Sequence, residues 1–171
     1  LKPHTYKTIT GNGYITKHNP DGDFLYGMEI CVDPDMRGLR IAQRLYNMRK
    51  KLCVDLELKG ITFGGRMMNY YKHKKKGVSP EEYLAGVQNK KYRDPALGLQ
   101  IRNGFEPIRV LKKYLIDDQN SLDYAAHMVW YNAMAKDRVK QSHTARRGSV
   151  RVASVQFQVR KVKSFDEFIA Q

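Results

Sequence analysis

The fold of this 171-residue chain is decided by the stretch Val32-Asp33-Pro34-Asp35-Met36-Arg37-Gly38-Leu39-Arg40-Ile41-Ala42-Gln43-Arg44-Leu45. A β-rich run stops at its beginning, because Pro34 cannot donate a hydrogen bond to a strand ladder. Apolar residues then recur at helical spacing, at Ile41, Leu45, Met48 and Leu52. The stretch therefore predicts a strand, a tight basic turn and an amphipathic helix over residues 38–57.

The turn that opens this helix has the chemistry of a phosphate site. The first turn of a helix leaves backbone N–H groups unpaired and carries the positive end of the helix dipole. Gly38 lets the backbone approach a ligand closely, and positive charge is added by Arg37, Arg40 and Arg44. An ordinary strand–turn–helix unit with a solvated basic face is the alternative interpretation.

The segments on either side of this stretch predict strands. Upstream, residues 13–17 and 24–32 have strand composition, and a loop over 18–23 with Pro, Asp and Gly joins them as in a hairpin. Downstream, Gly60 follows the helix end and Ile61-Thr62-Phe63 is a short β-rich run. Because strand, helix and strand follow one another, we expect parallel pairing across the crossover.

Further elements complete an α/β pattern. Ser79-Pro80-Glu81-Glu82 combines an N-cap serine, a proline at the first helical position and a glutamate three residues after the cap, which predicts a helix start. Another helix is expected over residues 95–103, where Asn103-Gly104 ends it. Residues 105–116 and 124–132 predict two closing strands.

The composition changes after residue 132. Between residues 133 and 163 there are nine lysines and arginines and one acid, a net charge of +8, whereas the whole chain carries +14. We interpret residues 133–148 as a basic linker, because charge of this kind is more typical of a solvated segment than of a binding groove. Residues 149–171 begin a second, truncated segment with a strand-like run over 150–157.

Other features of the whole sequence bear on the cellular compartment and on metal binding. No apolar run reaches the ~18 residues that span a bilayer, and no secretory leader follows Leu1, so we expect no membrane partner and a fragment of a longer protein. The two cysteines, Cys31 and Cys53, have neither disulfide-framework nor metal-ligand spacing. The sequence thus predicts a cytoplasmic protein without a metal site.

The stretch quoted first resembles the acyl-CoA pyrophosphate loop of the GNAT superfamily of N-acetyltransferases, whose pattern is Gln/Arg-x-x-Gly-x-Gly/Ala. Arg37 and Ala42 match the outer positions, whereas Arg40 stands where the family has Gly. Asn103-Gly104-Phe105-Glu106 resembles the family's helix-to-strand junction. The resemblance implies an α/β (α+β) fold over residues 1–132, with a mixed, centrally splayed sheet flanked by helices and incomplete at its N-terminus.

A narrower resemblance is carried by the segments R-G-L-R-I-A-Q-R-L-Y-N-M-R-K-K-L-C (37–53), F-G-G-R (63–66) and L-Q-I-R-N-G-F (99–105). They look like the GNAT half of bifunctional proteins fused to a carbon–nitrogen hydrolase (nitrilase-like) domain. Residues 150–157 are similar to the opening strand of that hydrolase. The resemblance implies that 149–171 start a hydrolase domain, whose Glu, Lys and Cys would lie beyond residue 171.

The GNAT resemblance also implies acetyl-CoA as cosubstrate and an amine acceptor that attacks the thioester directly. The pantetheine arm would run along the backbone of Ile30, Cys31 and Val32. The pyrophosphate would be held by the backbone N–H groups of Arg37, Gly38, Leu39, Arg40, Ile41 and Ala42.

Two side chains are candidates for proton transfer under this resemblance. Glu29 shares its strand face with Gly27 and Cys31, which leaves room for a ligand, and a half-buried carboxylate there could accept a proton. A structural pairing of Glu29 with a nearby arginine is the alternative. Gln100 stands where the family has its general-acid tyrosine, and an amide can hydrogen-bond a thiolate but cannot protonate it. Other candidates for that acid are Tyr70, Tyr71 and Tyr124.

Two further functions stay open at the level of sequence. One is a non-catalytic CoA-binding or regulatory module of a nitrilase-like amidohydrolase, which Gln100 favours. The other is a basic nucleic-acid-binding protein. No RNA-binding signature supports the latter, and much of the positive charge falls in the predicted linker, so a nucleic-acid partner is disfavoured.

Overall fold

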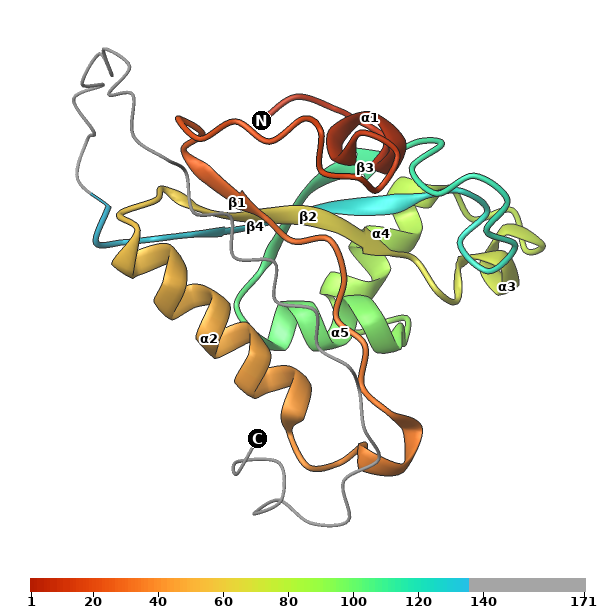
Figure 1. The fold of residues 1–171 in the computed structure, drawn as a ribbon. Coiled ribbons are helices and arrows are strands. Elements are labelled where there is room, and N and C mark those ends of the chain that lie inside the picture. The colour runs from red at the N-terminus through yellow and green to blue at the C-terminus, as the bar shows by residue number, and fades with distance from the viewer. Residues whose placement is uncertain (136–171) are drawn as a thin grey trace. The chain divides into compact units, whose positions relative to one another are not determined.

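The computed structural model describes residues 1–135 of the chain (Figure 1). The predicted linker 133–148, from residue 136 on, and the predicted second segment 149–171 lie outside the described residues. The described elements are, in chain order, α1 (Tyr6–Thr10), β1 (Phe24–Tyr26), a 3-10 turn (Pro34–Met36), α2 (Ile41–Asp55), β2 (Gly60–Arg66), α3 (Tyr70–Lys74), α4 (Pro80–Gln88), α5 (Pro95–Arg102), β3 (Glu106–Leu111) and β4 (Ala125–Tyr131). Within residues 1–135, none of these helices is long and apolar enough to cross a membrane.

The four strands form one mixed sheet in the order β1-β2-β4-β3. β1 pairs with β2 in parallel, in the register Phe24 with Gly60 and Tyr26 with Thr62. β4 pairs antiparallel with both β2 and β3. The parallel pairing predicted across the strand–helix–strand unit is therefore confirmed, and β1 is left at one edge of the sheet.

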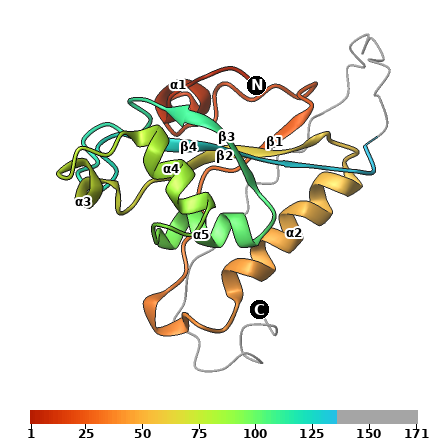
Figure 2. The same cartoon turned by 180° about the vertical axis from the view of Figure 1, so that it is seen from behind.

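Helices flank both faces of this sheet, as the two opposite views in Figures 1 and 2 show. α2 and α5 lie on one face and α1 lies on the other. The larger apolar cluster joins α2, α4 and α5 to β2, and includes Tyr46, Phe63, Tyr83, Leu97 and Phe105. A smaller cluster on the α1 side is formed by Leu111, Tyr114 and Ala125, with Tyr6 packed against it. The predicted α/β sheet flanked by helices is thus confirmed.

The sequence signals at Ser79 and Asn103 predicted a helix start and a helix end correctly. Ser79 caps α4 in a reciprocal capping box with Glu82, and the helix starts at Pro80 as predicted. α5 ends at Arg102, directly before the predicted stop at Asn103. These signals act within one turn of the chain, so distant contacts do not overturn them.

The predicted strand over residues 13–17 is wrong. This segment consists of turns that follow α1. Two of its residues have left-handed φ angles, Gly13 at 85° and Ile15 at 59°, and so do Gly11 and Asn12 directly before it. A left-handed residue reverses the chain and cannot continue a strand. No hairpin forms with the next strand, because β1 takes its pairing from β2 instead.

The predicted strand over residues 24–32 is too long. Ladder pairing in β1 ends at Tyr26, and the last hydrogen bond to β2 is from the Gly27 N–H to the Thr62 carbonyl, at 2.9 Å. Beyond Gly27 the chain leaves β2, which itself continues to Arg66. We call this point of separation, at Gly27 and Thr62, the β1–β2 fork; it is the splay that the resemblance implies.

The exposed and buried faces of α2 differ from the usual arrangement of an amphipathic helix, in which the apolar stripe packs on the core. Leu45, Met48 and Leu52 remain 40%, 63% and 46% exposed. The fully buried residues are Tyr46 and Cys53, which are seven positions apart and so share a face. That face lies about a quarter turn from the apolar stripe and packs toward β2.

Candidate functional site

The turn before α2 presents a helix N-terminus without a side-chain cap. Arg40 occupies the N-cap position, makes no capping hydrogen bond, and no acidic residue stands in the first turn. The preceding Asp33 is engaged in its own 3-10 turn, where its carboxylate accepts from the Asp35 N–H at 2.9 Å. The first N–H groups of α2 therefore keep the partial positive charge that favours an anion.

The backbone of this turn explains two residues of the motif. Gly38 has a φ of 89°, and a Cβ placed there would meet nothing within 4 Å, so glycine is needed for conformation and not for space. Arg40 has a φ of 57°, the left-handed conformation that glycine adopts most easily. Arg40 thus reproduces the backbone shape of the glycine that the GNAT pattern has at this position.

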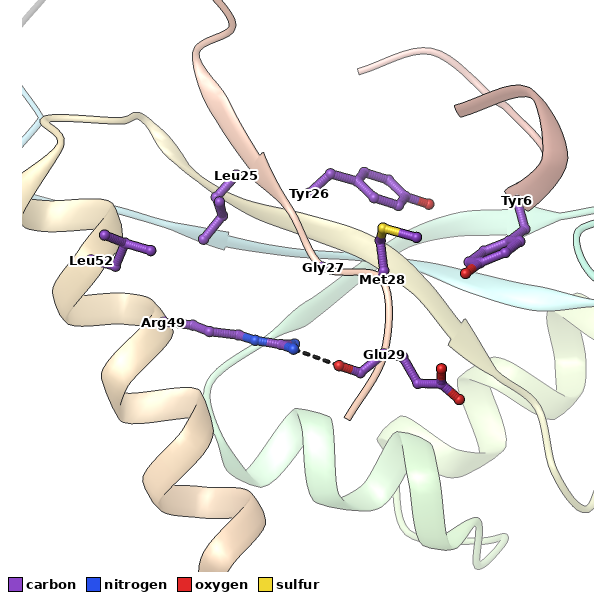
Figure 3. A pocket seen from close by; sticks show the side chains of 8 residues that line it. All are labelled: Tyr6, Leu25, Tyr26, Gly27, Met28, Glu29, Arg49 and Leu52. Carbon is purple, nitrogen blue, oxygen red and sulfur yellow. Dashed lines mark hydrogen bonds between the residues drawn. The ribbon is translucent and has the colours of Figure 1, made fainter. Parts of the chain in front are cut away.

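Beyond the β1–β2 fork, the chain from Met28 to Asp33 has no strand pairing. This segment contains the predicted pantetheine-contacting residues Ile30, Cys31 and Val32, and Ile30 packs against the larger core cluster. The Arg49 guanidinium of α2 donates a hydrogen bond to the Glu29 carbonyl oxygen, which ties the unpaired segment to the helix (Figure 3). The backbone here is therefore held in place without a neighbouring strand.

Glu29 is exposed, so the expectation of a half-buried carboxylate is wrong. The reason is the fork itself, because the strand on which Glu29 was expected to lie ends three residues earlier, at Tyr26. The side chains of Glu29 and Cys31 lie on the same side, as strand alternation predicts. A hydrogen bond to the Glu29 carboxylate raises the pKa of the Cys31 thiol.

The glycine pair of β2 receives a polar side chain on each face. A Cβ on Gly64 would lie 2.1 Å from Cζ of Tyr114, and a Cβ on Gly65 would lie 2.3 Å from Oε1 of Gln100. Both positions therefore need glycine for close approach of a side chain to the backbone. Sequence reasoning missed Tyr114, although two successive glycines inside a strand are a signal of such an approach.

Gln100 lies in α5 with a buried Oε1 that has no hydrogen-bond partner among the described residues. Its side chain hydrogen-bonds Tyr46. Burial raises the pKa of Tyr46, and the hydrogen bond with Gln100 offsets part of that rise. Two of the tyrosines suggested as alternative acids, Tyr70 and Tyr124, pack against each other, and the Tyr70 ring also packs against Tyr83. The Tyr70 hydroxyl donates to the Val78 carbonyl at 3.2 Å.

A cavity of about 430 Å³ runs along β1 (Figure 3). Among the predicted site residues it contacts Glu29 but not the pyrophosphate turn. Its lining consists of Tyr6, Leu25, Tyr26, Gly27, Met28, Glu29, Arg49 and Leu52. Side chains from both faces of β1 contribute, since Leu25 and Tyr26 point in opposite directions along the strand. The cavity and the uncapped helix N-terminus are thus two separate features.

No family model matches the chain. Two curated relatives come from Bacillus subtilis (strain 168). "Probable hydrolase YhcX" is 39% identical over 168 residues, which cover 98% of this chain and 33% of the relative. "Uncharacterized N-acetyltransferase YkwB" is 38% identical over 133 residues, which cover 78% of this chain and 58% of the relative. The chain therefore spans about a third of the first relative and somewhat more than half of the second.

A solved structure has the same fold. It is "GphF GNAT-like decarboxylase in complex with isobutyryl-CoA", with a TM-score of 0.62 and 18% sequence identity, over 77% of this chain and 69% of that one. At this identity the match concerns the fold alone. The mixed sheet, the β1–β2 fork and this structural match together identify the fold of residues 1–135 as a GNAT fold.

Proposed function

We propose that the chain carries an acyl-CoA-dependent N-acetyltransferase, which transfers acetyl from acetyl-CoA directly to an amine. The observation that carries the proposal is the uncapped N-terminus of α2, preceded by the left-handed Arg40 and Gly38. A diphosphate suits this position because it accepts several backbone N–H groups and is stabilised by the helix dipole. The name of the GNAT-fold neighbour, which mentions bound isobutyryl-CoA, supports a CoA thioester as ligand.

In this proposal the pyrophosphate lies on the N–H groups of Gly38 to Ala42, because the N–H of Arg37, which was also expected to hold it, already donates to the Pro34 carbonyl at 3.2 Å. The pantetheine arm follows the backbone of Ile30, Cys31 and Val32. That backbone can hydrogen-bond a ligand, because none of the strands within residues 1–135 pairs with it beyond the fork. Glu29, exposed beside Cys31, takes the proton of the amine. Gln100 donates a hydrogen bond near the departing sulfur.

A second candidate is a CoA-binding module without turnover, attached to a carbon–nitrogen hydrolase. The amide at position 100 favours it, since an amide supplies no proton. The name of the first relative, a hydrolase of which this chain covers 33%, supports a hydrolase domain in the longer protein, beyond residue 171. Under this candidate acetyl-CoA binds, but no amine is acetylated.

Calorimetric titration with acetyl-CoA tests the binding step. We expect saturable binding by the wild-type chain, weakened at least about tenfold in an Arg37→Ala/Gly38→Val variant, because valine strains the left-handed turn and one cation is lost. The matched control is Arg93→Ala/Gly77→Val, since Gly77 has a φ of 79° with nothing within 4 Å of its Cβ position.

Equal losses in the two double variants, or no binding by a folded wild type, would refute the assignment of the phosphate site. Binding followed by release of free thiol in the presence of an amine separates the transferase from the non-catalytic module. Suitable amines are a polyamine, an amino-acid amide and a lysine peptide, tested in turn.

A further inference from the structure

A line of hydroxyl groups starts at the β1–β2 fork. Thr62 still pairs with β1, because its carbonyl accepts from Gly27. Residues two apart in a strand turn their N–H groups to the same side, so Gly64 is the next residue of β2 to face β1. β1 has already separated there, and the Gly64 N–H donates instead to the Tyr114 hydroxyl at 3.3 Å.

From Tyr114 the line continues to the edge of the sheet. The hydroxyl oxygens of Tyr114 and Tyr26 lie 2.8 Å apart, and Tyr26 Oη lies 2.9 Å from Nε2 of His4. His4 Nδ1 lies 3.0 Å from the Lys2 carbonyl, and because a carbonyl can only accept, Nδ1 carries the proton. Nε2 is therefore the His4 nitrogen that exchanges a proton with Tyr26.

The two tyrosines, Tyr26 and Tyr114, can carry a proton while they stay neutral. Burial raises the pKa of both hydroxyls, that of Tyr26 far above its ordinary value, so neither ionises near neutral pH. A neutral hydroxyl can pass a proton on by giving one and receiving another. His4 is half-buried and so lies at the border between this line and solvent.

The aromatic groups that face the His4 ring are two tyrosines and a second histidine. Tyr26 and Tyr114 are neutral, and the ring of His127 in β4 meets His4 edge-on at 4.9 Å between centroids. His127 Nε2 donates to Thr62 Oγ1 at 2.9 Å, because that hydroxyl itself donates to the Met128 carbonyl. Burial, then His4 and Arg109, lower the pKa of His127 to about 4, so it is uncharged at neutral pH.

We propose that Tyr114 is the acid that protonates the departing CoA thiolate, and that Tyr26 and His4 return the proton to it. This inference rests on the proposed acetyl transfer. Tyr114 fits because it lies on the opposite face of the Gly64–Gly65 pair from Gln100, whose amide has no proton to give. Its hydroxyl is also held at the fork, because it accepts from the Gly64 N–H just beyond the point where β1 and β2 separate.

The acetyl transfer can be written with every bond and proton accounted for. The neutral amine forms a bond to the acetyl carbon and loses one proton to Glu29, while the carbon–sulfur bond breaks and its electron pair stays on sulfur. Sulfur takes the Tyr114 proton, Tyr114 takes that of Tyr26, and Tyr26 takes the Nε2 proton of a protonated His4. Neutral His4 then regains a proton from solvent, and Glu29 releases the amine's proton to solvent.

The test compares Tyr114→Phe, Tyr26→Phe and His4→Gln with wild type, in the full chain, with acetyl-CoA and the amines named above. We expect each to lower kcat about 10- to 100-fold, while the dissociation constant for acetyl-CoA changes by less than about twofold. The double variant Tyr26→Phe/His4→Gln should be no slower than either single one, because both interrupt the same line.

The matched control is Tyr83→Phe, which also removes a buried hydroxyl, one that donates to Asp94 at 2.8 Å and lies outside the line. Turnover of Tyr114→Phe equal to that of Tyr83→Phe, or wild-type turnover in His4→Gln, would overturn the role of the line while leaving the transferase intact. A wild type that binds acetyl-CoA but acetylates none of the amines would overturn both. Nitrogen NMR of His4 gives a readout without turnover, because Tyr26→Phe should move the Nε2 resonance and Tyr83→Phe should not.

Discussion

At the scale of the residue, glycines of this chain fall into two physical kinds. Gly38 is needed for its left-handed backbone, and Arg40 shows that another residue can adopt a similar conformation at a cost of about 1 kcal/mol. Gly64 and Gly65 are needed for space, because Tyr114 and Gln100 lie directly on their Cα atoms. The first kind shapes a backbone for a ligand, and the second admits side chains to the fork.

A glycine substitution tests this distinction. We expect Gly64→Ala to lower the free energy of unfolding by about 1–3 kcal/mol, since the Tyr114 ring must move away from the new methyl group. Gly98→Ala is the control, because its Cβ would meet only the mobile end of Arg102, at 3.3 Å, and alanine favours a helix by about 0.5–1 kcal/mol. Urea denaturation measures both changes, and a loss in Gly64→Ala no greater than in Gly98→Ala would contradict the packing described here.

At the scale of the element, the face of α2 that is buried is not the face that carries its apolar stripe. Its buried face carries Tyr46, which packs on Phe63 and Phe105, together with Cys53. Its apolar stripe of Leu45, Met48 and Leu52 points away from this core. The helix is thus fixed by a few large contacts with β2, and its position holds the uncapped N-terminus next to the unpaired segment.

Substitutions on the two faces of α2 should therefore differ sharply. Met48→Ser should change the free energy of unfolding by less than about 0.5 kcal/mol, because the side chain is 63% exposed. Tyr46→Ala should cost about 3–5 kcal/mol, because it empties a ring-sized volume in the core. Thermal or urea unfolding of the two variants provides the comparison, and a larger loss for Met48→Ser would mean that the stripe is packed.

At the scale of the whole molecule, burial of a neutral histidine links the free energy of unfolding to pH. The folded-state pKa of His127 is about 4, below the ordinary value of 6.5, so the unfolded chain binds a proton first as pH falls. The stability that depends on neutral His127 is complete above pH ~6.5 and is lost as the pH falls toward about 4, with a slope of at most ~1.4 kcal/mol per pH unit.

Urea denaturation at several pH values between 7 and 4 measures this slope. In His127→Gln the slope between about pH 6.5 and 5 should flatten, because the remaining acids titrate mainly below that range. His18→Gln, at an exposed position, should keep the wild-type slope. An unchanged slope in His127→Gln would assign the pH dependence to other groups.

The sequence by itself determined the features that depend on a few neighbouring residues. The capping box at Ser79, the helix end at Asn103 and the basic turn at Gly38 follow from local backbone preferences, and the strand–helix–strand order was enough to predict parallel pairing. Only the tertiary structure decided where β1 leaves β2, which face of α2 is buried, and that Tyr26 meets Tyr114, 88 residues away in the chain. The physical reason is that these depend on contacts with distant segments, whose packing energy exceeds the local preferences that a sequence pattern reports.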